Sequence, residues 1–88
     1  MGSFKVKLKP SAEKDLRKIS PDRLEILRRE IDKLADNPFP HKCRKLSGTE
    51  GLLRHRIGDY RIIYEVNIKK KIVIIYYIRH RKEAYRNV

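Results

Sequence analysis

The chain is poor in acidic residues, in cysteine and in long hydrophobic runs. Its 88 residues include 11 Asp and Glu against 23 Lys and Arg, with a single cysteine. No apolar run approaches the roughly 20 residues that a membrane span requires. The lysines that alternate through FKVKLKP leave no hydrophobic region for a secretory signal. These absences argue against a membrane protein and a disulfide-stabilised secreted domain, so we expect a cytoplasmic protein in a reducing compartment.

The lone thiol and the scattered carboxylates also give little support to thiol or metal chemistry. A catalytic thiol needs a base and an orienting partner. His41 is two residues from Cys43, but both lie in a loop that begins with NPFPHK. No cluster of carboxylates suggests a metal site. We therefore expect a structural cysteine, no metal and no cofactor.

The excess of positive charge is the most informative feature of the composition. The net charge is +12 at pH 7, and residues 51–88 contribute +7 of it through 10 basic and 3 acidic side chains. Such a field favours a polyanionic partner, most often nucleic acid and less often an acidic protein or a membrane. Charge alone does not choose among these partners.

Hydrophobic periodicity predicts a single domain over residues 1–88. Phe4, Val6 and Leu8 alternate with lysines, which is typical of a half-buried strand. Ser11 is the expected N-cap of a first helix. A second helix is expected to begin at Pro21 and to end near Asp36, because its apolar residues recur at intervals of three and four: Leu24, Leu27, Ile31 and Leu34.

The second half of the chain changes to a period of two. Residues 52–57, 60–67 and 71–79 are predicted strands, joined by turns at 58–59 and 67–70. The predicted fold is therefore α+β with the order β-α-α-β-β-β. A helical hairpin should pack on one face of a mostly antiparallel four-stranded sheet, and the first strand should add in parallel through the helical crossover.

Strict alternation divides the strand side chains between two faces. The mostly apolar set, which includes His55, is expected against the helices. The opposite set carries five arginines and part of the last strand: Arg54, Arg56, Arg61, Arg79, Arg81, Val73, Ile75 and Tyr77. Two guanidinium groups about 4 Å apart repel by roughly 1 kcal/mol even in water, and a bound anion would relieve that cost. The alternative to anion binding is that the arginines are solvated or paired with carboxylates. The carboxylates expected nearby are Asp59, Glu65 and Glu83, which are too few to neutralise the five arginines.

The amino-acid sequence of the second half of the chain resembles that of the RelE/ParE toxin superfamily. The residues that carry the resemblance are KLSGTEGLLRHRIGDYRIIYEV and, after one more strand, IRHRKEAY. The resemblance covers nearly the whole chain. It implies a toxin of a type II toxin–antitoxin system, neutralised by an acidic, RelB-like antitoxin through which any contact with operator DNA would run.

The RelE branch implies a ribosome-dependent, metal-independent endoribonuclease that cuts mRNA in the A site. In that chemistry the RNA 2′-hydroxyl attacks its own adjacent phosphate. The two strand lysines of this branch fall on Arg54 and Arg56, the arginine after the turn tyrosine falls on Arg61, and the C-terminal pair falls on Arg81 and Tyr85. An arginine stays protonated, so the replacement of both lysines leaves the general base unassigned.

Two other hypotheses stay open. A ParE-like protein would keep the fold and inhibit DNA gyrase without nuclease activity, and a small nucleic-acid-binding or adaptor domain would be unrelated to toxins. A histidine is the usual side chain for a general base, but alternation directs both His55 and His80 toward the helix side. Tyr64, Tyr76 and Tyr77 are assigned to core packing, and the lysines at 69–71 to a solvated turn.

Overall fold

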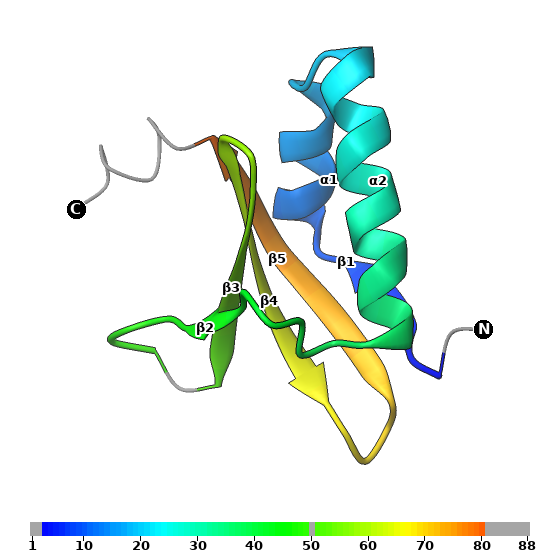
Figure 1. The fold of residues 1–88 in the computed structure, drawn as a ribbon, viewed down its shortest axis with the longest axis vertical. Helices are drawn as coiled ribbons and strands as arrows, with labels where there is room; N and C mark the ends of the chain where they lie inside the picture. Colours follow the sequence, from blue (N-terminus) through cyan, green and yellow to red (C-terminus); the bar gives the residue numbers. More distant parts are fainter. Residues whose placement is uncertain (1–2, 50, 81–88) are drawn as a thin grey trace.

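The fold consists of two layers, with both helices on one face of a twisted sheet (Figure 1). The computed structural model describes residues 3–49 and 51–80. The elements in chain order are β1 (Lys5–Leu8), α1 (Pro10–Arg17), α2 (Pro21–Asp36), β2 (Arg44–Lys45), β3 (Leu52–Ile57), β4 (Tyr60–Asn67) and β5 (Ile72–His80). The α+β class and the open face opposite the helices are as predicted.

The sheet has five strands in the order β1-β5-β4-β3-β2. β1 pairs in parallel with β5, and the other neighbours are antiparallel. The predicted count of four was one too low, because Arg44 and Lys45 in the expected loop pair with Arg54 and Leu53. A strand of two residues is too short for a period-two pattern, so its pairing with β3 is what defines it.

Both helices begin with proline at the first helical position, where no N–H is required. The prediction of Ser11 as an N-cap was wrong, because α1 begins at Pro10 and its N-cap is Lys9. The Ser11 hydroxyl instead donates a hydrogen bond of 2.5 Å to the Tyr76 carbonyl. Neither helix in the described ranges is long and apolar enough to cross a membrane.

The core lies between the helices and the sheet. Its fully buried side chains come from both helices, β4 and β5: Ala12, Leu27, Leu34, Ile62, Tyr64, Val73, Ile75 and Ile78. The Tyr64 hydroxyl donates a 2.7 Å hydrogen bond to the Pro38 carbonyl, which fastens the segment after α2 to the centre of the sheet. Burial and the neighbouring Cys43 thiol raise the pKa of Tyr64.

A β-bulge in β5 reverses the predicted orientation of half of that strand. Tyr64 pairs with Ile75 whereas Ile63 pairs with Tyr77, so Tyr76 is the extra residue. Val73 and Ile75 are consequently buried against the helices, where strict alternation had placed them on the open face. The assignment of Tyr77 to core packing was also wrong, since its side chain is 38 % exposed.

Candidate functional site

Three arginines form a row across the open face of the sheet. Arg56 of β3 is the direct partner of Arg61 of β4, and Arg61 is the direct partner of Arg79 of β5. Directly opposite residues of antiparallel strands have Cβ atoms about 4.5–5.5 Å apart and project to the same side. The register therefore places these three arginines side by side on one face of three neighbouring strands.

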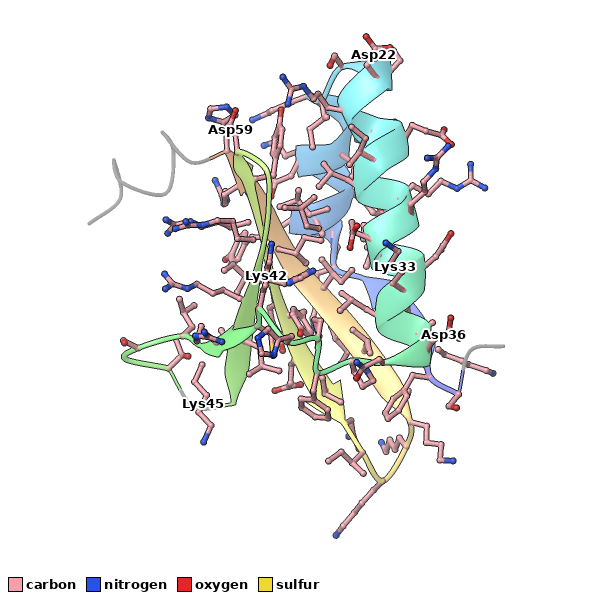
Figure 2. The ribbon with its side chains drawn as sticks, viewed as in Figure 1. Asp22, Lys33, Asp36, Lys42, Lys45 and Asp59 are labelled. Atoms are coloured by element: carbon pink, nitrogen blue, oxygen red, sulfur yellow. The ribbon has the colours of Figure 1, made fainter. Side chains whose placement is uncertain are left out.

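A second row lies two residues along the strands. Arg54 pairs with Arg44 of β2 on one side and with Ile63 of β4 on the other, and Ile63 pairs with Tyr77. Figure 2 shows nitrogen-tipped side chains projecting from the face of the sheet that the helices leave uncovered. We call the surface formed by Arg54, Arg56, Arg61, Arg79 and Tyr77 the arginine face.

Few carboxylates lie near the arginine face among the described residues, and Asp59 of the turn between β3 and β4 lines a small pocket with Arg56 and Arg61. Glu65 is the only acidic residue that β3, β4 and β5 contribute within the described ranges, and it pairs with Leu52 and Ile74. Asp15 of α1 reaches the edge of β5, where its Oδ2 lies 3.6 Å from Arg79 Nε. Like charges directly opposite on a sheet disfavour the pairing, so the arginine rows are best suited to receive an anion such as a phosphodiester.

Asp15 also fixes the part of β5 that carries Arg79. β1 pairs with β5 only as far as Ile75, and beyond that residue no strand within 3–49 and 51–80 pairs with this edge of β5. The Asp15 carboxylate accepts a 3.0 Å hydrogen bond from the Ile78 N–H at that edge. The guanidinium of Arg79 lies over the Tyr77 ring, 4.6 Å from its centroid. Helix α1 thereby holds both the strand and the arginine in place.

The structure brings three of the five predicted site residues together. Arg54, Arg56 and Arg61 lie on one face as expected. Arg81 and Tyr85 lie outside the described residues. Arg79, which alternation had also placed on the open face, is directly opposite Arg61, and this pairing depends on the register between β4 and β5.

The two described strand histidines lie on the helix side, as predicted. The His80 ring packs edge-to-face on Tyr60, with centroids 5.2 Å apart. His55 is 7 % exposed, and its Nε2 lies 3.8 Å from Glu30 Oε2. Burial lowers the pKa of His55 below 6.5, although the Glu30 carboxylate opposes that shift. The sheet separates His55 from the arginine face.

A cavity of about 640 Å³ adjoins His55 on the helix side. It lies between the C-terminal half of α2, the segment at 37–42 and β3. Lys33, Asp36 and Lys42 are among its lining residues and are labelled in Figure 2. Its cations and carboxylates are mixed, so this cavity lacks the uniform positive charge of the arginine face.

Comparisons with known proteins agree on one family. Residues 6–85 match the family model described as ParE toxin of type II toxin-antitoxin system, parDE. A protein of Methanocaldococcus jannaschii that carries the name toxin RelE1 is 33 % identical over 87 residues, which cover 96 % of this chain and 97 % of that protein.

Solved structures of RelE proteins have the same fold. A RelE–RelB complex from Pyrococcus horikoshii matches with a TM-score of 0.79 and 32 % identity over 90 % of this chain and 96 % of the other. The RelBE2 complex of Mycobacterium tuberculosis matches with a TM-score of 0.80 and 25 % identity. This match covers 89 % of this chain and 98 % of the other. The isolated Escherichia coli RelE toxin is similar in fold, with a TM-score of 0.76 and 19 % identity. This match covers 97 % of this chain and 98 % of the other.

Proposed function

The chain belongs to the RelE/ParE superfamily of toxins from type II toxin–antitoxin systems, and from this premise we propose that it is a ribosome-dependent endoribonuclease. Its substrate is mRNA in the ribosomal A site, so it acts in the cytoplasm and inhibits translation. The observation that carries the proposal is the row of Arg56, Arg61 and Arg79 across three strands. Preorganised positive charge of this kind stabilises the charge that develops during phosphoryl transfer.

The reaction needs neither metal nor cofactor. The 2′-oxygen of the RNA attacks the adjacent phosphorus, the bond from phosphorus to the 5′-oxygen breaks, and the products are a 2′,3′-cyclic phosphate and a 5′-hydroxyl. Arg61, between its two arginine neighbours, holds the non-bridging oxygens as the phosphorane gains charge, and Arg54 contacts the same phosphate from the second row. In this scheme Arg81 stabilises the leaving oxygen.

The proton of the 2′-hydroxyl requires an acceptor other than an arginine. His55 and His80 are on the wrong side of the sheet for this role. Tyr85 remains the candidate within the chain, either as a hydrogen-bond partner of the 2′-hydroxyl or as a base-stacking residue, with a ribosomal group handling the proton. Orientation and charge stabilisation then provide most of the catalysis.

Expression from a tightly controlled promoter tests the proposal. We expect growth arrest and cuts within translated codons, mapped by primer extension, and we expect Arg61→Ala and Arg81→Ala to abolish the cuts. Arg29→Ala is the matched control, because Arg29 lies on α2 with its side chain 73 % exposed and pairs only with Glu25 among the described ion pairs. Arrest with intact mRNA would refute the nuclease.

A second candidate function follows from the family model, which is that of ParE toxins. A ParE-like protein would inhibit DNA gyrase and would not cleave RNA. Growth arrest with intact mRNA and an induced DNA-damage response would support it. The absence of arrest would instead favour an inactive homologue or an adaptor.

The proposed partner is a cognate acidic antitoxin. Two of the similar structures are complexes of RelE with RelB, and a surface with several neighbouring arginines favours a negatively charged protein. Operator DNA would be bound through that antitoxin. Co-expression with the small acidic protein encoded beside the toxin should abolish growth arrest, whereas continued arrest despite a stable complex would contradict this assignment.

A further inference from the structure

Tyr77 has an environment that core packing does not explain. Among the described residues, Phe39 and Tyr77 are the aromatic side chains with more than a third of their surface exposed, at 47 % and 38 %. Phe39 lies in the segment that follows α2, whereas Tyr77 lies in β5 and pairs with Ile63 of β4. A large ring at such a position stabilises the fold less than a buried one would, because part of its apolar surface stays in water.

The β-bulge allows Tyr77 to face the arginines while Val73 and Ile75 are buried. Strict alternation would place all three side chains on one face, so the extra residue at Tyr76 is what separates the exposed Tyr77 from the buried residues before it. With the bulge, Tyr77 shares a face with Arg79 two residues later, and Arg79 is directly opposite Arg61. Bulges often re-aim a side chain beside a functional site.

The ring lies within one nucleotide's reach of the phosphate-binding row. Tyr77 is opposite Ile63, and Arg61 is two residues from Ile63 on the same strand face. Diagonal neighbours of this kind are separated by about 7–8 Å, a distance that long and aromatic side chains span. A nucleotide whose phosphate contacts Arg61 can therefore place its base over the Tyr77 position.

The guanidinium of Arg79 adds a cation to the exposed ring. It lies over the Tyr77 ring, 4.6 Å from its centroid, and its Nε is 3.6 Å from Asp15 Oδ2. Unpaired bases stack on aromatic rings and on guanidinium planes, with little dependence on sequence. A buried core tyrosine offers neither surface.

We infer that Tyr77, together with the Arg79 guanidinium stacked on it, is a binding platform for an unpaired nucleobase beside the phosphate site. The inference rests on the proposed RNA-directed function and adds to it a base-binding residue. Asp15 is a positioning residue in this arrangement, because it holds Arg79 and the Ile78 backbone without facing the RNA. The platform binds the base through its π-face and therefore tolerates all four bases.

Binding of two matched single strands tests the platform. One is a short RNA oligonucleotide, and the other is an abasic ribose-phosphate strand of the same length and charge. We expect Tyr77→Leu to weaken RNA binding about tenfold, as loss of one stacked base does, and to leave the abasic strand unaffected. Tyr77→Phe keeps the ring and should bind RNA within about twofold of the original protein. Arg61→Ala should weaken both strands.

A fluorescence measurement gives an independent readout. The chain contains no tryptophan, so Tyr77→Trp places a single reporter in the platform. We expect its emission to be quenched by RNA and not by the abasic strand. Equal quenching by both strands would overturn the platform even if Tyr77→Leu did not fold.

The outcomes separate this inference from the proposed function. Equal RNA affinity of Tyr77→Leu and the original protein, with Arg61→Ala weakened, would overturn the platform and leave RNA binding intact. Failure of the original protein to bind either strand would count against both. Weaker binding of an acidic antitoxin, with unchanged RNA binding, would assign Tyr77 to a protein interface instead.

Discussion

The salt dependence of RNA binding measures how many arginines on the sheet contact phosphates. Arg54, Arg56, Arg61 and Arg79 lie in two adjacent rows. Each phosphate neutralised on a single strand contributes about −0.7 to the slope of log K against log salt. Four such contacts give a slope of about −2.8. The association constant should then fall about fiftyfold between about 50 and about 200 mM salt.

Removal of one arginine should reduce that slope by a defined amount. We expect Arg61→Ala to bring it to about −2.1, so the same change in salt weakens binding only about eighteenfold. Arg29→Ala removes an equal charge from the exposed surface of α2 and should leave the slope near −2.8. Fluorescence anisotropy of a labelled RNA oligonucleotide over a salt series measures both values.

The comparison of the two variants decides the cause of binding. Equal slopes for Arg61→Ala and Arg29→Ala would mean that the net charge of +12 attracts RNA without a defined site. A slope near zero in the original protein would refute the electrostatic reasoning altogether. A selective reduction in Arg61→Ala localises the phosphates to the arginine face.

Three further predictions concern the stability of the scaffold. The lowered pKa of His55 means that the unfolded chain binds a proton more readily, so the free energy of unfolding should decrease as the pH falls below 6.5; urea titrations from pH 8 to about pH 5 measure it. Tyr64→Phe should cost about 1–2 kcal/mol, because the Pro38 carbonyl loses its buried donor, and should lower the melting temperature by about 4–8 °C per kcal/mol. Asp15→Ala should cost about 1–3 kcal/mol in urea unfolding, since the Ile78 N–H loses its acceptor.

Conservative replacements serve as controls for these measurements. His55→Gln does not titrate in this range and should lose the acid-dependent part of the instability; an unchanged profile would assign it to other groups. Asp15→Asn retains an oxygen that can accept the Ile78 hydrogen bond and should be more stable than Asp15→Ala. Equal loss in both would show that charge, rather than the hydrogen bond, holds the edge of β5. A melting temperature unchanged in Tyr64→Phe would contradict the role given to its hydroxyl.

The sequence predicted the elements whose signals are local. The leucine spacing located α2 and its end at Asp36, and the Gly58–Asp59 turn defined the ends of β3 and β4. Alternation within β3 and β4 placed Arg54, Arg56 and Arg61 on the open face. These features depend on residues close together in the chain, which a pattern of period two or 3.6 records.

Local patterns were insufficient where partners are distant in the chain. Ser11 was expected to cap a helix, but its hydroxyl donates a hydrogen bond to the carbonyl of Tyr76, which is 65 residues away in the chain. In the apolar run IVIIYYI every position suits a buried strand, so hydrophobicity contains no sign of the extra residue at Tyr76. The bulge is set by the pairing with β4 and by the packing of Val73, Ile75 and Ile78 against the helices.

The sequence by itself determined the basic character of the protein, its α+β class, its superfamily and three arginines of the candidate site. Only the tertiary structure decided that Arg79 is directly opposite Arg61 and that Val73 and Ile75 are buried while Tyr77 stays exposed. The physical reason is that alternation specifies which side of one strand a residue occupies, whereas its neighbours depend on hydrogen bonding between strands. A single bulged residue changes the register and reverses the faces of the residues before it, and in this protein it buries Val73 and Ile75 while Tyr77 stays on the arginine face.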